Sequence, residues 1–462
     1  MSQHTLRRVQ EQAKSLRSSE AIPYETLLDG RMVESALAEE QIEFRDRIFT
    51  PLITLWVFLN QVLSPDHSCR EAVSKLIAFL VSQGERPCSP DTSSYCDARK
   101  RLPVSFLARL MRGIGDLLEP KAHPDWRWKG RAVHLIDGST VSMPDTPENQ
   151  AVYPQSRSQK PGLGFPLARI VAIISFTTGA VRDLAIGPYK GKETGETSLF
   201  RTLVHRLKRG DVVLGDRYFA SFFGIAQLVE RGIDGVFRMH QLRKVDFRRG
   251  RSLGVEDHQV LWHKPQRPDW MDEATYASIP DEMWVRELRV RVTEPGYRVS
   301  ELVLVTTLLD SIEYPKKEIA KLYMGRWNVE LDLRSIKVVM QMDILRCKKP
   351  ELVEKEIWVH LLAYNIIRKL MMTAGTCHDV PPREISFKGT LQALEAFGDR
   401  MEMATPTSRQ TLWAEMLAVI AHHRVGERPG RVEPRAIKRR PKPHPLLKLP
   451  RDQARKQLLK TA

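Results

Sequence analysis

The spacing of apolar residues divides the chain into regions with different periods. In residues 1–120 apolar positions recur about every 3.6 residues, which is the period of an amphipathic helix. The clearest helical stretches are 31–63, 71–83 and 104–118. We therefore predict an all-α amino-terminal domain over 1–120, and the polar connector 121–131 marks its end.

After the connector the apolar runs are short and of strand length. Residues 132–145 predict a buried strand that ends at Asp137, and 211–221 predict another that ends at Asp216. Two strands joined by a Thr-Thr-Gly turn are predicted between them, in 167–189. The order β, β, β, α, β, α, β is completed by helices at 197–208 and 222–231 and a strand at 235–239. This order is typical of the RNase H-like fold, so we predict an α/β core whose first and fourth strands bring the two aspartates together.

The remaining regions differ in composition. Residues 240–300 are rich in charge and contain predicted strands at 257–263 and 284–293. A strand at 301–310 and a long helix at 352–373 follow. The predicted divisions after the amino-terminal domain are the first part of the core at 130–239, an insertion at 240–300, the second part of the core at 301–375, a helical region at 376–423 and a basic tail at 424–462.

Residues 321–340, KLYMGRWNVELDLRSIKVVM, carry Tyr323, Arg326, Glu330 and Lys337. A regular helix turns about 100° per residue, so these side chains fall within a stripe about 60° wide. Both flanks of the stripe are apolar, with Leu322, Val329, Leu333 and Ile336 on one side and Trp327, Leu331 and Val338 on the other. This pattern fits a functional site on a helix buried along both flanks. It also fits a solvated face with i,i+4 ion pairs such as Arg326 with Glu330.

The charge of the chain favours a polyanionic partner. The formal net charge is +16 and the isoelectric point is near 9.6, so nucleic acid is the first candidate partner and an anionic membrane surface is the second. Residues 424–462 contain 13 Lys or Arg against 3 Asp or Glu, a net of +10. Prolines exclude a regular helix from 428–445, so we predict an extended arm that neutralises phosphates without reading bases. A simple solubility tail is the alternative.

The five cysteines are odd in number and form no CxxC pair, which favours free thiols in a reducing compartment over a disulfide framework or a zinc finger. A metal site at His67 and Cys69 is disfavoured because further ligands are missing. The first 18 residues are polar and charged, unlike a secretory signal. The longest apolar run, 48–63, is too short for a membrane span and predicts a buried helix, so we expect a cytoplasmic protein.

Three consecutive cations, Arg99, Lys100 and Arg101, stand between two predicted helices. Beside the hydroxyl residues of 93–95 they form a candidate phosphate contact. A charged start of the next helix is the alternative interpretation.

The motif Y-x2-R-x3-E-x6-K, spelled by Tyr323, Arg326, Glu330 and Lys337, resembles the signature of the insertion-sequence-4 family of bacterial DDE transposases. LIDGSTVSMPD and VLGDRYFASF are similar to the segments that carry the first and second catalytic aspartates of this family. The resemblance covers about 130–375, and the segment around Arg99 also resembles an A-R-x-R-L segment found in the family.

The resemblance implies roles for these residues. Asp137, Asp216 and Glu330 would be the catalytic acids and would hold two Mg²⁺ ions, for which Mn²⁺ can substitute, with Asp137 bridging both. The other three signature residues would hold phosphates near the cleaved end. The implied partners are double-stranded DNA, as element ends and as target, and a second copy of the chain on paired ends, at the nucleoid.

The resemblance also implies that 240–300 are a β-rich insertion. Some relatives use an insertion tryptophan to stabilise an unstacked base. The candidates here are Trp262, Trp270 and Trp284, and a role in the core is the alternative for each.

We therefore expect a transposase that cuts the ends of its own element and joins them to target DNA. Two other functions stay open: an RNase H-like nuclease that cuts without joining, and a transposase-derived DNA-binding protein without catalysis. The presence of all three acids argues against the last.

Overall fold

The protein is described here by a computed structural model, which covers residues 28, 30–41, 48–291, 301–426 and 445–461. The chain forms two compact units, and each unit combines segments that are distant in sequence. The first unit contains 1–132, 173–184 and 328–425, and the second contains 133–172, 185–327 and 426–462. Within the described ranges no helix has the length and apolarity needed to cross a membrane.

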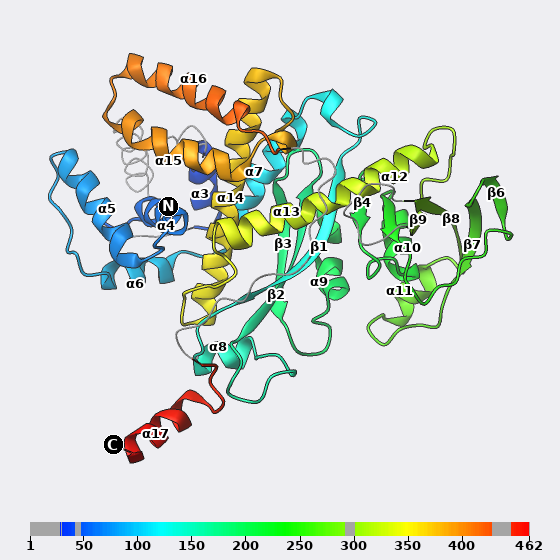
Figure 1. Cartoon of the computed structure of the whole chain (residues 1–462), viewed down its shortest axis with the longest axis horizontal. Coiled ribbons are helices and arrows are strands. Elements are labelled where there is room, and N and C mark those ends of the chain that lie inside the picture. Colours follow the sequence, from blue (N-terminus) through cyan, green and yellow to red (C-terminus); the bar gives the residue numbers. More distant parts are fainter. Residues whose placement is uncertain (1–27, 29, 42–47, 292–300, 427–444, 462) are drawn as a thin grey trace. The chain divides into compact units, whose positions relative to one another are not determined.

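Helices make up most of the first unit (Figure 1). Its amino-terminal helices are α3 (Gly30–Glu39), α4 (Pro51–Leu63), α5 (Cys69–Ser82), α6 (Ser93–Arg101) and α7 (Val104–Lys121). Side-chain caps begin two of them, because the Thr50 hydroxyl accepts from the Ile53 N–H and the Ser68 hydroxyl accepts from the Glu71 N–H. The predicted helical character of this region is confirmed for the described residues, and α4 occupies the apolar run 48–63.

The longest helix, α14 (Pro350–His378), is buried along most of its length. Asn365 on α14 is fully buried, and its amide accepts from the Val181 N–H at 2.8 Å and donates to the Val181 and Met111 carbonyls at 2.8 and 3.0 Å. These bonds satisfy a polar group in the core and fix the 173–184 segment to α14 and α7. The helices that follow in this unit are α15 (Phe387–Met403) and α16 (Pro406–His422).

The second unit is organised around a nine-stranded sheet with the strand order β3-β2-β1-β4-β5-β9-β8-β7-β6. The strands before the insertion are β1 (Val133–Ser142), β2 (Leu167–Ser175), β3 (Val181–Pro188), β4 (Val212–Gly215) and β5 (Asp234–Arg238). The tip of the β2–β3 hairpin belongs to the first unit. Strand β4 is parallel to both β1 and β5, and each of these pairings spans a helix, as parallel neighbours require. The helices beside these strands are α8 (Pro147–Val152), α9 (Glu196–Leu203) and α10 (Phe222–Glu230).

The charged region 240–300 extends this sheet (green strands in Figure 1). Its elements are β6 (Arg251–Gly254), β7 (Asp257–His263), α11 (Glu273–Ser278) and β8 (Glu282–Arg291), and β9 (Glu301–Thr306) follows it. Strand β9 is antiparallel to β5 and joins the extension to the first five strands. A buried bidentate ion pair between Arg286 and Asp257, at 2.8 and 2.6 Å, links β8 to β7.

The segment 321–340 is not the single regular helix that its periodicity predicts. It contains the end of α12 (Lys316–Met324), a 3₁₀ turn at Gly325–Trp327, α13 (Asn328–Arg334) and a π-helical turn at Ser335–Val339. The division between the two units also falls inside it, after Trp327. The 60° stripe therefore does not apply, because the segment departs from α-helical rotation at two places.

The flanks of that segment differ in burial. The side with Leu322, Val329, Leu333 and Ile336 is buried. On the other side Leu331 and Val338 are 52% and 59% exposed, and Trp327 is half-buried. The prediction of two buried flanks is therefore wrong for one side.

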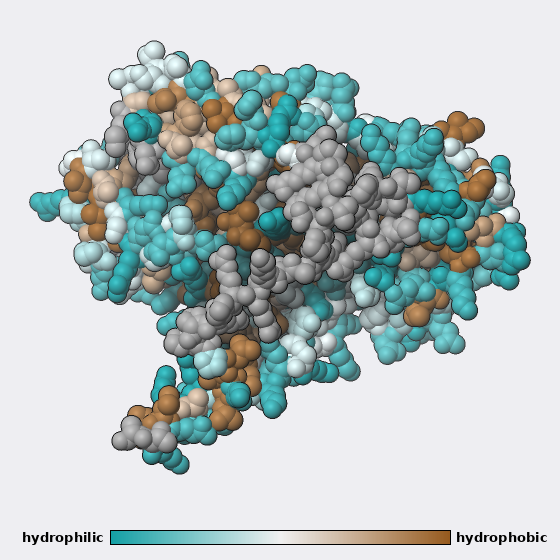
Figure 2. Space-filling view, viewed as in Figure 1, coloured by the Kyte–Doolittle hydropathy of each residue, from teal (hydrophilic) through white to brown (hydrophobic). Residues whose placement is uncertain are grey.

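Most of the proline-rich part of the tail lies outside the described residues. The described end of the tail contains α17 (Arg451–Thr461), a helix that the sequence interpretation did not include. Figure 2 shows apolar residues on the surface of this helix and the segment before it, where Leu446, Leu458 and Leu459 are more than 70% exposed.

Candidate active site

The two aspartates occupy neighbouring parallel strands. In the pairing of β1 with β4, Val133 lies beside Val212 and Leu135 beside Leu214. Continuing this register by two residues sets Asp137 beside Asp216. The predicted adjacency of the first and fourth strands is thus confirmed, and the structure brings these two carboxylates together within the second unit.

Only one of the two aspartates lies at the predicted place along its strand. Asp137 does not end its strand, because β1 continues to Ser142. Asp216 does follow the last residue of β4, and its Oδ1 accepts from the Tyr218 N–H at 2.8 Å. Asp137 Oδ1 accepts from the Gly138 N–H at 2.9 Å. Both side chains are half-buried, so they remain open to solvent or substrate.

A third acid of the same unit, Glu196, lies close to this pair. A Cβ placed on Gly138 would be 2.4 Å from Glu196 Cδ, so the glutamate carboxyl packs against the glycine Cα. Burial raises the pKa of Glu196, and the nearby Asp216 charge raises it further against the opposing effect of Arg169. Sequence reasoning did not identify Glu196 as part of the site. Nothing in the local sequence around residue 196 marks it.

The environment of Asp137 favours its protonated form. Burial is the largest effect and raises its pKa from the usual 3.8 to about 6, and the charges of Glu196 and Asp216 act in the same direction. The Gly138 N–H and Arg326 oppose the shift. Arg326 near Asp137 and Arg169 near Glu196 therefore do not fully compensate the charge of the three acids.

Arg326 is the cation next to Asp137. Its Nη1 lies 3.9 Å from Asp137 Oδ2, and its guanidinium also packs near the rings of Tyr323 and Trp327, at 5.9 and 5.4 Å from their centroids. The side chain is only 9% exposed. The aromatic contacts orient it toward the first aspartate.

Tyr323 is buried, contrary to the prediction that its hydroxyl holds a phosphate. Its hydroxyl donates to the Gly215 carbonyl at 3.2 Å, and the backbone of Arg238 hydrogen-bonds to it as well. Burial raises its pKa to about 12. Tyr323 therefore bridges the ends of β4 and β5 and fixes the residue before Asp216.

Glu330 lies in the first unit, whereas the two aspartates lie in the second. Its helix α13 is fixed by Asp332, which is fully buried, accepts from Arg383 at 2.7 Å with both oxygens, and is paired with Arg368. Two residues on a helix are about 200° apart, so Glu330 points away from that buried network and is exposed. The buried ion pairs of this helix are thus made by Asp332.

Lys337 lies in the π-helical turn and is half-buried. Burial lowers its pKa, and the charge of Asp343 opposes this. Such turns are frequent at functional sites.

The donor set fits hard divalent cations. Asp137 and Asp216 supply only carboxylate oxygens, which Mg²⁺ and Mn²⁺ prefer, and a divalent ion would reverse the shift that favours protonated Asp137. In the described part of the chain no three His, Cys, Asp or Glu side chains are gathered as a preformed metal site. The structure therefore presents a pair of aspartates in one unit and the glutamate in the other.

Known proteins are similar to the part of the chain that contains the three acids. The family profile described as "Transposase DDE domain" matches residues 128–366, which is just over half of the chain. The chain belongs to the DDE transposase family. The strands of both aspartates and the segment of Glu330 lie inside the matched region.

The predicted resemblance to insertion-sequence-4 transposases is confirmed. The transposase is 29% identical to Transposase InsG for insertion sequence element IS4 of Escherichia coli (strain K12) over 428 residues, which cover 90% of this chain and 92% of that protein. It is 36% identical over 81 residues to Putative transposase InsL for insertion sequence element IS186A of the same strain, covering 18% of this chain and 21% of the relative. A solved piggyBac transposase synaptic complex with hairpin DNA gives a TM-score of 0.42 at 9% identity, over 86% of this chain and 84% of that one.

Family membership establishes the class of reaction. The protein is an enzyme of DNA transposition, which proceeds by DNA cleavage and strand transfer. DNA is its substrate, and enzymes of this family generally use divalent metal ions.

The three consecutive cations of the transposase do not form one surface. Arg99 is 6% exposed and stacks near Phe58 and Tyr95, so its guanidinium is not presented on the surface. Lys100 and Arg101 are exposed, and Lys100 is paired with Asp97 at 2.7 Å. The cations end α6 instead of beginning the next helix, and a helix carboxyl end is favourable for positive charge.

The three insertion tryptophans have different environments. Trp262 is buried and its Nε1 donates to Glu287 Oε1 at 2.8 Å, so it belongs to the core. Trp270 is half-buried, with Arg201 stacked 3.7 Å from its ring. Trp284 on β8 is 51% exposed.

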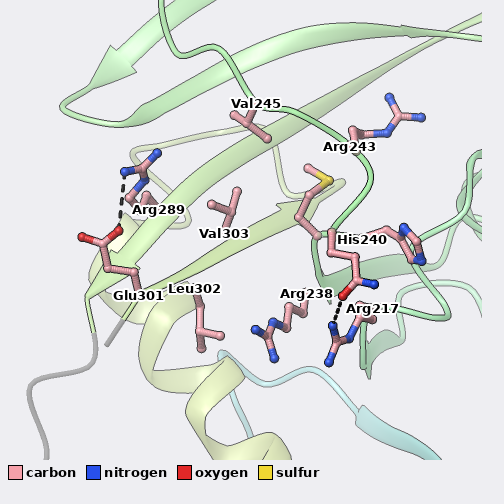
Figure 3. Close-up of a pocket in the computed structure, with 11 residues that line it drawn as sticks. Arg217, Arg238, His240, Arg243, Val245, Arg289, Glu301, Leu302 and Val303 are labelled. Atoms are coloured by element: carbon pink, nitrogen blue, oxygen red, sulfur yellow. Dashed lines mark hydrogen bonds and ion pairs between the residues drawn. The ribbon is translucent and has the colours of Figure 1, made fainter. Parts of the chain in front are cut away.

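A cationic cavity of about 270 Å³ lies in the second unit of the transposase, against the strands that join the core to the extension (Figure 3). Valine and leucine side chains of β9 line it together with polar groups from the β4 and β5 ends. Its charged lining residues are Arg217, Arg238, Arg243, Arg289 and Glu301. Arg217, which follows Asp216 directly, hydrogen-bonds to Gln241 in this cavity. Sequence reasoning did not identify this group, because its members come from separate elements.

Proposed function

We propose that Asp137, Asp216 and Glu330 are the catalytic acids of this transposase. The observation that carries the proposal is the parallel register that sets Asp137 beside Asp216, with Arg326 3.9 Å from the first. Glu330 follows Arg326 by four residues in the signature, and Asp332 turns it away from the buried network of its own unit. The order β3-β2-β1-β4-β5 supports an RNase H-like core, with β6–β8 as the insertion of the family.

We infer that these carboxylates would hold two Mg²⁺ ions. When bound, two such ions make a water or a 3′-hydroxyl nucleophilic and stabilise the leaving oxygen. Asp137 must be ionised for this, and Arg326 favours the ionised form. Tyr323 holds the end of β4, and therefore Asp216, in place. Arg326 and Lys337 supply positive charge for phosphates next to the one that is cut.

We infer further that the enzyme acts on the ends of its own insertion element. Two ends must be handled together, so we expect a homodimer on paired ends, in the cytoplasm with the nucleoid. The cationic cavity of the second unit, the exposed Lys100 and Arg101 and the basic tail are candidate contacts to the DNA backbone.

Alanine substitution of each acid tests the proposal. Asp137→Ala, Asp216→Ala and Glu330→Ala should each reduce Mg²⁺-dependent end cleavage by more than about 100-fold and leave affinity for end DNA nearly unchanged, because a lost metal ligand costs several kcal/mol in the transition state. Glu313→Ala, at an exposed acid before α12, is the matched control. Near-normal cleavage by the Glu330 variant would show that another residue is the third acid.

Precleaved ends separate transposition from simple nuclease action. The wild-type enzyme should join a precleaved 3′-hydroxyl end to target DNA, and all three variants should fail. Cleavage of ends without any joining would favour the nuclease function.

A further inference from the structure

Three cysteines of the first unit surround one buried arginine, outside the site described above. Arg99 Nη2 donates to Cys96 Sγ at 3.5 Å, and Nη1 lies 4.0 Å from Cys347 Sγ. The Cys69 thiol, at the first residue of α5, belongs to the same cluster, because Gln61 Nε2 donates to Cys69 Sγ at 3.7 Å and Gln61 Oε1 accepts from Arg99 Nη1 at 3.4 Å. Cys69 and Cys96 also influence each other's pKa. Two thiols from different helices therefore meet beside a fixed positive charge.

The charge of Arg99 is not compensated by a carboxylate. In the part of the chain that the structure describes, no acid lies within ion-pair distance of its guanidinium, and its Nε has no hydrogen-bond partner. The group is 6% exposed and contacts the Phe58 and Tyr95 rings at 5.1 and 4.9 Å. A buried cation in such surroundings favours an anion next to it. An ionised thiol is the group available to supply that charge.

The other titratable groups around Arg99 favour their neutral forms. Burial raises the pKa of Tyr95, of the Cys347 thiol and of Glu356, whose carboxyl accepts from the Arg346 and Cys347 N–H groups. The pKa of Cys69 is also raised, first by its hydrogen bond with Cys96. That same hydrogen bond and the charge of Arg99 lower the pKa of Cys96 to about 5, against the effect of burial. The exposed Lys100 acts in the same direction.

The cysteines also differ in their exposure to solvent. Cys96 and Cys69 are half-buried, whereas Cys347 and Cys88 are buried. Cys377, near the end of α14, is exposed. A small oxidant can therefore reach the Cys96–Cys69 pair, and the buried thiols are poorly placed to compete.

We propose that Cys96 is a peroxide-reactive thiolate and that Cys69 resolves its oxidised form, so that the pair forms a reversible disulfide between α5 and α6. The sulfur of Cys96 attacks hydrogen peroxide, which breaks the O–O bond, forms Cys96–SOH and releases hydroxide. The Cys69 thiol then attacks that sulfur, forms the S–S bond and releases water. The two thiols lose two electrons and two protons in total, and peroxide is reduced to two waters. A dithiol reductant reverses the reaction.

Peptide mapping of the full-length protein tests the pairing. Reduced protein is exposed to hydrogen peroxide, blocked with an alkylating reagent and digested. We expect a linked pair of peptides containing Cys69 and Cys96, lighter by about 2 Da than the sum of the reduced peptides and lost after dithiothreitol. Cys96→Ser should abolish the link, Cys69→Ser should leave a sulfenic acid at Cys96 that a dimedone probe traps, and Cys377→Ser should behave as wild type. A link between Cys96 and Cys347, or no link at all, would overturn the proposal.

The pH dependence of alkylation tests the thiolate without any substitution in the core. At pH 6.5 Cys96 should alkylate at least about tenfold faster than the exposed Cys377, because only the thiolate reacts. If Cys377 reacts faster at this pH, or if the rate at Cys96 rises only near pH 8–9 as for an ordinary thiol, Cys96 is not held as a thiolate.

Discussion

The carboxyl group of Glu196 lies against the Cα of Gly138, where an added Cβ would be 2.4 Å from Glu196 Cδ. This contact joins the start of α9 to the middle of β1, one residue after Asp137. A side chain at 138 fits only if Glu196 moves, because the strand and the acid leave no room for a Cβ. The contact also brings a third negative charge to the aspartate pair.

Gly138→Ala should therefore disturb the site more than the fold. The atom in the way is the end of a flexible side chain, so Glu196 can move and the loss of stability should be about 1 kcal/mol. End cleavage should fall by more than about tenfold because the acids around Asp137 are displaced. Denaturant unfolding and a cleavage assay measure the two effects.

Two further variants test whether the contact with Glu196 causes the loss of stability in Gly138→Ala. Gly195→Ala is the matched control, because nothing lies within 4 Å of a Cβ at that position. Glu196→Ala combined with Gly138→Ala should recover the lost stability. An equal loss of stability in the single and the double variant would mean that the Glu196 contact is not the cause.

Asp137→Asn should stabilise the metal-free protein at neutral pH. The folded-state pKa of about 6 lies above the usual 3.8, so the folded protein holds this proton more tightly than the unfolded chain. Stability therefore falls as pH rises from about 4 to about 6, and above pH 6 the full penalty of about 1–3 kcal/mol is present. The asparagine carries no charge and avoids this penalty. Its advantage in melting temperature should be largest above pH 6 and absent below pH 4.

Divalent ions should make the wild-type protein more stable than the Asp137→Asn variant. Mg²⁺ or Mn²⁺ should raise the melting temperature of the wild-type protein, because a bound cation stabilises ionised Asp137. The Asn variant should gain much less. Equal gains for both proteins would show that the ion does not bind at Asp137.

The sequence predicts the parts of this site that follow from local periodicity. Short apolar runs ending near Asp137 and Asp216 predict β1 and β4, and the strand order then brings the two residues together. Glu196 escapes notice because its approach to Gly138 is a tertiary contact between residues 58 apart. The regular helix predicted for 321–340 fails for a related reason. Periodicity assumes a constant rotation, whereas the 3₁₀ turn at Arg326 and the π-helical turn at Lys337 change it.

The burial of Tyr323 and Arg99 has a similar explanation. A polar side chain in a charged segment predicts a surface position by composition alone. Both residues instead find internal partners, the Gly215 carbonyl for Tyr323 and the cysteine sulfurs for Arg99. Such partners come from other elements and are not visible in local sequence.

Tyr323→Phe should slow catalysis without weakening DNA binding. The substitution keeps the buried ring and removes the hydrogen bond to Gly215, at a cost of about 1 kcal/mol in stability. The end of β4 then loses a support next to Asp216, so the rate of cleavage at saturating DNA should fall several-fold while the Kd for end DNA stays the same. Tyr218→Phe, at an exposed tyrosine two residues after Asp216, is the control. A weaker Kd with an unchanged cleavage rate would restore the phosphate-contact interpretation of Tyr323.

The cationic cavity of the second unit predicts a specific change in salt dependence. Arg243 and Arg289 line it, far enough along the chain from Asp216 to be replaced without touching the acids. Arg243 stacks 3.6 Å from the Trp262 ring, and Arg289 is paired with Glu256 and Glu301 at 3.3 and 3.5 Å, so both guanidinium groups are held in place before DNA arrives.

If the cavity holds backbone phosphates, Arg243→Gln and Arg289→Gln should each lower the slope of log K against log salt by about 1. Lys75→Gln, at an exposed lysine on α5 of the first unit, should leave the slope unchanged. A slope that stays the same in both arginine variants would show that DNA does not occupy the cavity, and its positive charge would then serve only the local pairing with Glu256 and Glu301.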